Sequence, residues 1–267
     1  SLNTVNIRNK NFTWSSTFGL SHNKNTIKHL YYRYEDVLNE VGEVVGSKEV
    51  DDVNRGWFVG KDISAIWDHE FIGIWQEDEA EEAAKYGQQP GDAKVRDVNG
   101  DYKITQEDKV FLGQETPKFR WSFRNEFTLF RNWDISLNLY SQMGHKQSTT
   151  EYLNFFDNLG DYSNTYKREY WTPENKSNSY ARLKSTRPSN INPKKVINKG
   201  FIRLENISVS YRVPQQFARK LMAKEISIYG TVRNVAVWAF DKEWDYWDPE
   251  TKGLLPRTFT FGASITF

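Results

Sequence analysis

The chain has 267 residues, of which 36 are basic and 35 acidic, so its formal net charge at pH 7 is only +1. This balance argues against a nucleic-acid-binding surface, which would require a basic excess on one face. Cysteine is absent. Disulfides, thiolate nucleophiles and zinc–thiolate sites are therefore excluded.

Hydropathy alone does not show whether this chain is surrounded by water or by membrane lipid. Its mean hydropathy is strongly negative, and no run approaches the roughly 18 apolar residues of a membrane helix. Aromatic residues nevertheless make up 15% of the sequence, and strands of a transmembrane barrel alternate so that they never look apolar on average. The first residues, Ser1 to Thr4, show no signal peptide. If the protein is exported, we expect this sequence to be a fragment or a processed product.

Alternation of apolar and polar residues predicts an all-β chain. In chain order, strands are predicted at 12–20, 119–129, 133–143, 207–213, 224–237 and 258–267, with a weaker one around 56–66.

The last predicted strand has the clearest pattern. Its odd positions are apolar and its even positions small and polar, unbroken over ten residues, which is close to the 9–11 that a tilted strand needs to cross a membrane. The apolar face suits lipid and the polar face suits a wet lumen. Membrane insertion and barrel closure are expected from Phe259, Phe261, Ile265 and Phe267.

Long and short connections between the predicted strands alternate along the chain. A turn of about three residues joins the strands near 119–129 and 133–143, and a loop of roughly 55 residues follows. A connection of about ten residues comes next, and then an aromatic loop. Transmembrane barrels have short periplasmic turns and longer extracellular loops. We therefore expect extracellular loops at 67–116, 144–198 and 239–256 and a periplasmic C-terminus.

The segment from Asp97 to Asp108 follows the spacing of a calcium-binding loop. Side-chain oxygens fall at the first, third, fifth, ninth and last positions, and a backbone carbonyl falls at the seventh. The candidate ligands are Asp97, Asn99, Asp101, Lys103, Thr105 and Asp108. Two departures are Tyr102 at the sixth position, where glycine is usual, and Asp108 in place of a longer Glu. The alternative is an Asx-rich turn without metal.

Aromatic residues crowd the region before the last strand. Aromatic rings beside carboxylates suit stacking on sugar rings or docking a protein partner. The candidates are Trp238, Trp244, Tyr246, Trp247 and Asp248. The alternative is a loop that packs its own rings.

No enzyme signature is present. The four histidines are scattered without a metal-binding pair, and neither a phosphate-binding glycine loop nor a nucleophile elbow occurs. We predict no catalytic residues, and no cofactor other than the calcium of the Asp97–Asp108 loop.

The chain resembles the C-terminal part of SusC/RagA-like TonB-dependent outer-membrane transporters of Bacteroidetes. The resemblance covers nearly the whole chain in family order. Its motifs are Asn9 to Trp14, Gly73 to Gln76, Pro90 to Asp101, Pro117 to Phe119, the Phe-x-Arg-Leu-x-Asn strand at Phe201 to Asn206, Asp248 to Glu250, and Pro256 to Gly262.

The resemblance implies a plugged barrel of about 22 strands, of which residues 1–267 supply roughly the last seven. It implies import of oligosaccharides or oligopeptides, a SusD-like surface lipoprotein as lid, and energy relayed by TonB through the N-terminal remainder of the transporter. Tyr102 departs from the family's usual glycine. The expected surroundings are outer-membrane lipid, with no nucleic acid.

Two other interpretations stay open. One is a secreted carbohydrate-binding β-sandwich with a calcium-stabilised loop, although a sandwich gives no reason for loops to be long at one end only. The other is a passive porin of the same architecture. A plug domain in the parent protein would exclude it.

Overall fold

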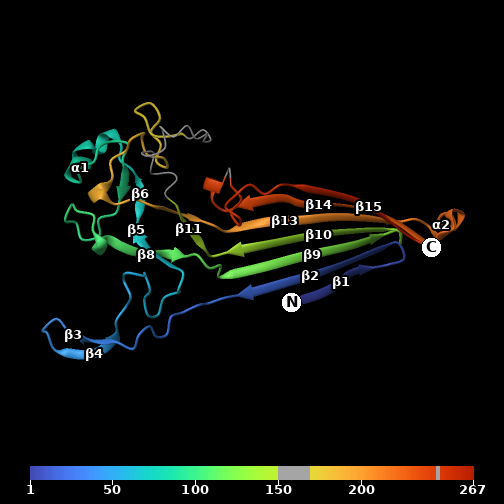
Figure 1. The fold of residues 1–267 in the computed structure, drawn as a ribbon, viewed down its shortest axis with the longest axis horizontal. Coiled ribbons are helices and arrows are strands. Elements are labelled where there is room, and N and C mark those ends of the chain that lie inside the picture. Colours follow the sequence, from blue (N-terminus) through green and yellow to red (C-terminus); the bar gives the residue numbers. More distant parts are fainter. Residues whose placement is uncertain (150–168, 245–246) are drawn as a thin grey trace. The chain divides into compact units, whose positions relative to one another are not determined.

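The computed structural model describes residues 1–149, 169–244 and 247–267. Two compact units can be distinguished (Figure 1). The sheet unit comprises Ser1–Lys24, Thr116–His145 and Asn198–Phe267, and the loop unit comprises Asn25–Glu115 and Lys146–Ile197. No helix in the described ranges is both long and apolar enough to cross a membrane.

The sheet unit is one antiparallel sheet of seven strands in which the order in space equals the order in sequence (Figure 1). Its strands are β1 (Leu2–Arg8), β2 (Phe12–His22), β9 (Phe119–Leu129), β10 (Trp133–Met143), β13 (Phe201–Arg212), β14 (Glu225–Ala239) and β15 (Thr258–Thr266). The expected all-β fold with about seven antiparallel strands is confirmed.

Two strand assignments differ from expectation. β1 was not predicted, because a register shift between Val5 and Ile7 breaks its alternation. The weak strand around 56–66 is wrong: Gly56 and Gly60 take positive φ angles of 69° and 84°, which interrupt an extended chain. Regular pairing begins only at β5 (Ala65–His69), outside the large sheet.

The register confirms one apolar and one polar face. One row across the sheet reads Ile7, Trp14, Phe127, Ile135, Val209, Gly230 and Phe261. The adjoining row reads Val5, Ser15, Glu126, Ser136, Ser208, Thr231 and Thr260. The apolar side chains are exposed on the last strand, β15, where Phe261 is 81% exposed. A β-sandwich would need a second large sheet across this face, whereas the other sheets in the described ranges have two strands each.

A small polar cluster interrupts the apolar face. Ser16 and Asn125 lie on it, and both are buried. Asn125 Oδ1 accepts hydrogen bonds from the Ser16 hydroxyl at 2.8 Å and from Trp14 Nε1 at 2.9 Å, and Asn6 Nδ2 donates to Ser16 Oγ at 2.7 Å. Polar groups facing hydrocarbon must find partners within the protein. This cluster meets that requirement.

Short and long connections leave opposite ends of the sheet, since successive strands run antiparallel. The short ones are residues 9–11, 130–132 and 213–224. In the second, Phe130 and Arg131 both have positive φ angles, as in the tight turns that suit twisted hairpins. The third contains α2 (Gln215–Ala218), and its residues Ala218 and Ala223 form a small core with Ile226 of β14. The long ones are 23–118, 144–200 and 240–257.

The loop unit is assembled from the first two long connections and has a core of its own. It contains the two-stranded sheets β3 (Tyr34–Leu38) with β4 (Val44–Glu49), β5 with β8 (Lys109–Gln114), β6 (Phe71–Ile74) with β7 (Ala93–Val95), and β11 (Lys146–Thr149) with β12 (Lys195–Asn198). The helix α1 (Ala80–Lys85) lies in the acidic segment. Trp75 and Trp171, one from each connection, are 3% and 7% exposed.

Candidate functional site

Two family motifs meet on the polar face of the sheet unit. Arg203, on β13, pairs by register with Tyr140 and Val237, so its side chain follows the polar rather than the lipid-type row. Its Nη2 lies 2.6 Å from Asp248 Oδ2 and 3.5 Å from Glu250 Oε2, and only 2% of the side chain is exposed. The arginine of the Phe-x-Arg-Leu-x-Asn strand thus holds the Asp-Pro-Glu segment.

The same segment is tied to β10. The Tyr140 hydroxyl donates to Glu250 Oε2 at 2.5 Å, and Gln142 Nε2 donates to Glu250 Oε1 at 2.9 Å. Asp248 Oδ1 accepts from the backbone N–H groups of Glu250 and Thr251, which winds the segment into a turn. Buried charges are tolerated when they are paired and hydrogen-bonded in this way. The network anchors the last long connection to two strands.

The predicted aromatic candidates that the structure describes lie in different surroundings. Trp238 belongs to β14 and pairs with Ile202 on the apolar face, where it is 53% exposed. Trp244 donates from Nε1 to the carbonyl of Asn198 at 2.7 Å, which fixes it near β12. Asp248 is the buried partner of Arg203, so it holds the loop rather than presenting a surface. Trp247 is half-buried. A substrate- or partner-binding role for these residues stays a prediction.

Tyr246, the remaining candidate, lies outside the described residues. The terminal-strand candidates are placed as expected. Phe259, Phe261 and Ile265 share the apolar face by register, and they are 60%, 81% and 53% exposed. Phe267 follows the strand and is 74% exposed.

The Asp97–Asp108 loop is tightly wound around its own carboxylates. Asp97 accepts from the N–H groups of Gly100 and Tyr102 at 2.7 and 2.9 Å. Asp108, fully buried, accepts from Val98 N at 2.8 Å and Thr105 N at 2.7 Å. Burial alone would raise the pKa of Asp108, but these backbone donors outweigh it and hold the pKa below its usual range.

The backbone accommodates Tyr102 at the sixth position of the loop, where glycine is usual. Tyr102 takes a left-handed φ of 61°, the conformation for which a calcium loop normally uses glycine. Its ring packs edge-on against Tyr86 at 5.5 Å, and Lys85 Nζ lies 5.0 Å from its centroid.

The winding of a calcium loop is therefore present. However, the described residues contain no group of three or more His, Asp or Glu side chains that converge as metal ligands. Asn99 and Asp101 each accept from a backbone N–H two residues on. Lys103 and Thr105 lie in the same loop, and Thr105 Oγ1 accepts from Glu107 N. Calcium binding stays a prediction for these residues.

A buried carboxylate organises the core of the loop unit. Asp92 is fully buried and accepts from Arg182 Nε at 2.9 Å and from Thr186 N at 2.7 Å. Trp171 Nε1 donates to Gln76 Oε1 at 3.0 Å. All three bonds join the two long connections. Asp92 belongs to the motif Pro90 to Asp101, but its role could not be predicted from sequence, because its partners lie about 90 positions away.

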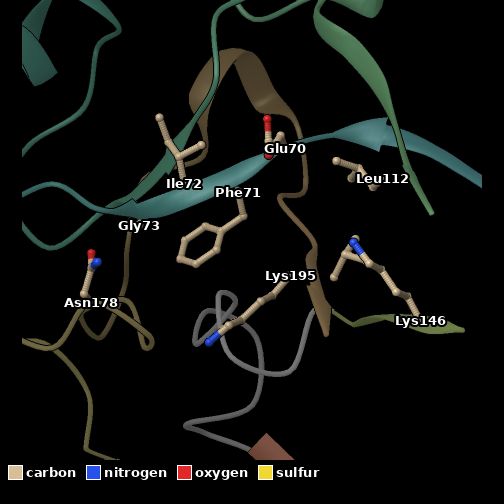
Figure 2. Close-up of a pocket in the computed structure, with 9 residues that line it drawn as sticks. Glu70, Phe71, Ile72, Gly73, Leu112, Lys146, Asn178 and Lys195 are labelled. Atoms are coloured by element: carbon tan, nitrogen blue, oxygen red, sulfur yellow. The ribbon is translucent and has the colours of Figure 1, made fainter. Parts of the chain in front are cut away.

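A groove of about 320 Å³ opens in the loop unit (Figure 2). Its lining combines apolar side chains from β6 and β8 with polar side chains from the second long connection. The lining residues are Glu70, Phe71, Ile72, Gly73, Leu112, Lys146, Asn178, Lys195 and Val196. This groove could not be predicted from sequence, because it depends on packing between segments far apart in the chain.

Known proteins match this chain over almost its whole length. No family model matches. The TonB-dependent receptors P26 and P3 of Formosa agariphila are 28% identical over 288 residues and 24% identical over 301 residues; each match covers 100% of this chain and 28% of the relative. The chain therefore spans little more than a quarter of these relatives.

Solved structures show the same fold. The RagAB peptide transporter matches with a TM-score of 0.66 at 15% identity, covering 99% of this chain and 28% of that chain. The RagAB peptide importer in its open-open state matches with a TM-score of 0.61 at 14% identity and the same coverage. These matches confirm the resemblance predicted from the motifs: along its whole length, the chain is similar to TonB-dependent receptors, and it shares its fold with part of the RagAB peptide transporter.

Proposed function

We propose that this chain forms part of the wall and loops of a TonB-dependent importer in a bacterial outer membrane. The proposal depends mainly on one observation, the seven-stranded antiparallel meander with one apolar and one polar face. Six of its strands have 9 to 15 residues, enough to cross the hydrocarbon layer when tilted. The whole-length similarity to TonB-dependent receptors supports the same function.

The outer edges of β1 and β15 are unpaired among the residues that the structure describes. An open edge is not tolerated in lipid, because each backbone N–H and C=O there would lack a partner. We therefore expect both strands to pair with strands of the remainder of the transporter, which completes a closed barrel. Phe259, Phe261, Ile265 and Phe267 would serve insertion and closure.

The expected mechanism is binding followed by gated passage, without covalent chemistry. The long connections would be extracellular and would meet substrate and a SusD-like lipoprotein, while the short turns and the C-terminus would be periplasmic. TonB would act through the N-terminal remainder. Oligopeptides or oligosaccharides are the substrate classes; the peptide transport named for the RagAB relatives favours the former.

The test uses the full-length parent protein in its native host. Deletion of the transporter gene, or of TonB, is expected to abolish uptake of a substrate that supports growth. Uptake that continues without TonB would instead indicate a passive porin. A parent protein that remains soluble without detergent would overturn the membrane location and favour a secreted binding protein.

A further inference from the structure

The groove of the loop unit presents positive charge and amide donors around an apolar floor. Lys146 and Lys195, the first residues of β11 and β12, both line it. Figure 2 shows the Phe71 ring between Asn178 and Lys195, with Lys146 further along the groove. Lys195 Nζ lies 5.9 Å from the centroid of that ring. The groove thus combines ammonium groups with a flat apolar surface.

A third donor is held in a fixed orientation. Asn178 Oδ1 accepts a hydrogen bond from the backbone N–H of Ile74 at 2.8 Å. This bond identifies the amide oxygen and leaves Nδ2 as the atom that can donate elsewhere. The carboxylate in the lining, Glu70, is neutralised by Arg96, whose Nη1 lies 3.0 Å from its Oε2. The lining therefore contributes two ammonium groups and one amide donor beside a carboxylate that is already paired.

Two glycines leave space for the side chains of Asn178 and Lys146 in the groove. Gly73 and Gly113 have φ angles of 138° and 148°, and the β-sheets carry register shifts beside both. A Cβ at Gly73 would lie 2.5 Å from Asn178 Oδ1, and one at Gly113 would lie 2.8 Å from Lys146 Cδ. Bulges of this kind re-aim side chains and are frequent beside binding sites.

The volume limits the size of the occupant. At about 320 Å³, the groove is at the lower end of the ~300–1,000 Å³ typical of ligand pockets. It can accept one sugar or amino-acid unit rather than a whole oligomer. An oxyanion would bind to the ammonium groups through charge-assisted hydrogen bonds, and a flat ring or aliphatic face would contact Phe71.

We propose that this groove is a subsite for one anionic unit of the imported substrate, recognised by a carboxylate or sulfate group. The inference rests on the proposed import function, because it assigns substrate chemistry to a loop of the importer. It makes the groove selective for acidic over neutral oligomers.

The test measures binding to the full-length transporter by ligand-observed NMR in detergent. Three matched pairs of probes separate the source of the anion: N-acetylphenylalanine and its amide, cellobiouronic acid and cellobiose, and glucose 6-sulfate and glucose. The anionic member of at least one pair is expected to bind about tenfold more tightly than its neutral match. The pair with the largest ratio identifies a peptide or a sugar source.

Variants connect this selectivity to the groove. Lys146→Gln and Lys195→Gln are each expected to reduce the anionic preference about tenfold, whereas the corresponding arginine variants retain it. Lys28→Gln, at an exposed lysine of the same unit, is the matched control and should have no effect. Gly113→Ala should weaken anion binding by displacing Lys146.

Equal binding of charged and neutral probes would overturn the inference, as would unchanged selectivity in both lysine variants. The importer function is measured separately, as TonB-dependent uptake by wild-type cells. If that uptake persists while charge selectivity is absent, only the subsite is wrong. If charge selectivity is present but uptake does not need TonB, only the import function is wrong.

Discussion

The guanidinium of Arg203 lies 2.6 Å from the carboxylate of Asp248, and these side chains are only 2% and 6% exposed. The pair joins a strand of the sheet to a connection 45 positions further along the chain. Glu250 and Tyr140 extend the contact to a second strand. One buried ion pair therefore fixes the middle of the last long connection against the sheet.

Breaking this pair is expected to be costly. Asp248→Asn leaves a buried guanidinium without its main counter-charge, which costs about 3–5 kcal/mol. The double variant Arg203→Met with Asp248→Asn should be less destabilised than the sum of the single variants. Urea unfolding of the full-length protein in detergent measures this coupling. Glu35→Gln, which removes the exposed pair with Lys48, is the control and should change the stability little. An additive double variant would contradict a direct coupling.

Adjacent residues of β15 provide a test of the two faces. Phe261 lies in the apolar row and Thr260 in the polar row. Phe261→Lys should impair insertion, because a lysine facing lipid costs up to ~2–4 kcal/mol, whereas Thr260→Lys should be tolerated. The fraction of folded protein in outer-membrane preparations, measured by heat-modifiable migration on gels, compares the variants. Equal impairment by both substitutions would argue against a lipid-facing row.

A pair of glycines in the loop unit separates backbone strain from packing. Gly91 and Gly87 have φ angles of 88° and 66°, so alanine at either costs about 1–2 kcal/mol in strain. A Cβ at Gly91 would also lie 2.4 Å from the Trp171 ring, whereas at Gly87 no atom lies within 4 Å. Gly91→Ala should therefore cost roughly 1–3 kcal/mol more than Gly87→Ala. Limited proteolysis of the loop unit measures the difference, and equal rates would contradict this packing.

Calcium binding by the Asp97–Asp108 loop is tested by metal addition and removal. Calcium is expected to raise the unfolding temperature of the full-length protein, and a chelator is expected to reverse the effect. Asp101→Asn should abolish the response, because Asp101 is exposed and supplies a carboxylate at the fifth ligand position. Asp78→Asn, an exposed acidic residue outside this loop, is the control. The same calcium response in the wild type and in Asp101→Asn would exclude the predicted site.

The loop should also lose stability in acid. The pKa of Asp108 is lower in the folded protein than in the unfolded chain. Its stabilising contribution is therefore complete above the usual pKa of about 3.9 and is lost as the pH falls through the lower folded value. Asp108→Asn should be destabilised at neutral pH and should lose less stability than the wild type as the pH falls below the usual pKa of about 3.9. Hydrogen exchange of residues 97–108 provides the measurement.

Local periodicity was enough to predict most of the sheet. Alternation with period two is visible in any single strand, and β9, with its apolar and polar residues in turn, begins and ends where expected. The alternation fails at β1. The β-bulge beside Asn6 shifts the register there, so Val5 lies in the polar row whereas Ile7 lies in the apolar row. The alternation also fails on the apolar face at Ser16 and Asn125, whose hydrogen bonds to each other replace apolar contacts.

Long-range pairing was beyond the reach of the sequence. The Asp-Pro-Glu motif was identified, but its partner on β13 could not be inferred from spacing. The two long connections were predicted as separate loops, although Gln76 and Trp171 join them into one unit. The groove at Phe71 and Lys146 was missed for the same reason. Such contacts depend on packing between segments that no local pattern relates.

The assembly of the loop unit from two separate segments has a consequence for the order of folding. Its contact between Gln76 and Trp171 spans 95 positions of chain, and β9 and β10 lie between them. Closing long loops slows folding more than it lowers stability, whereas the β9–β10 hairpin can form through neighbouring residues. The hairpin is therefore expected to mature early and the loop unit late. Refolding of the transporter should accordingly show protection of β9 and β10 before Trp171 becomes inaccessible to quenchers.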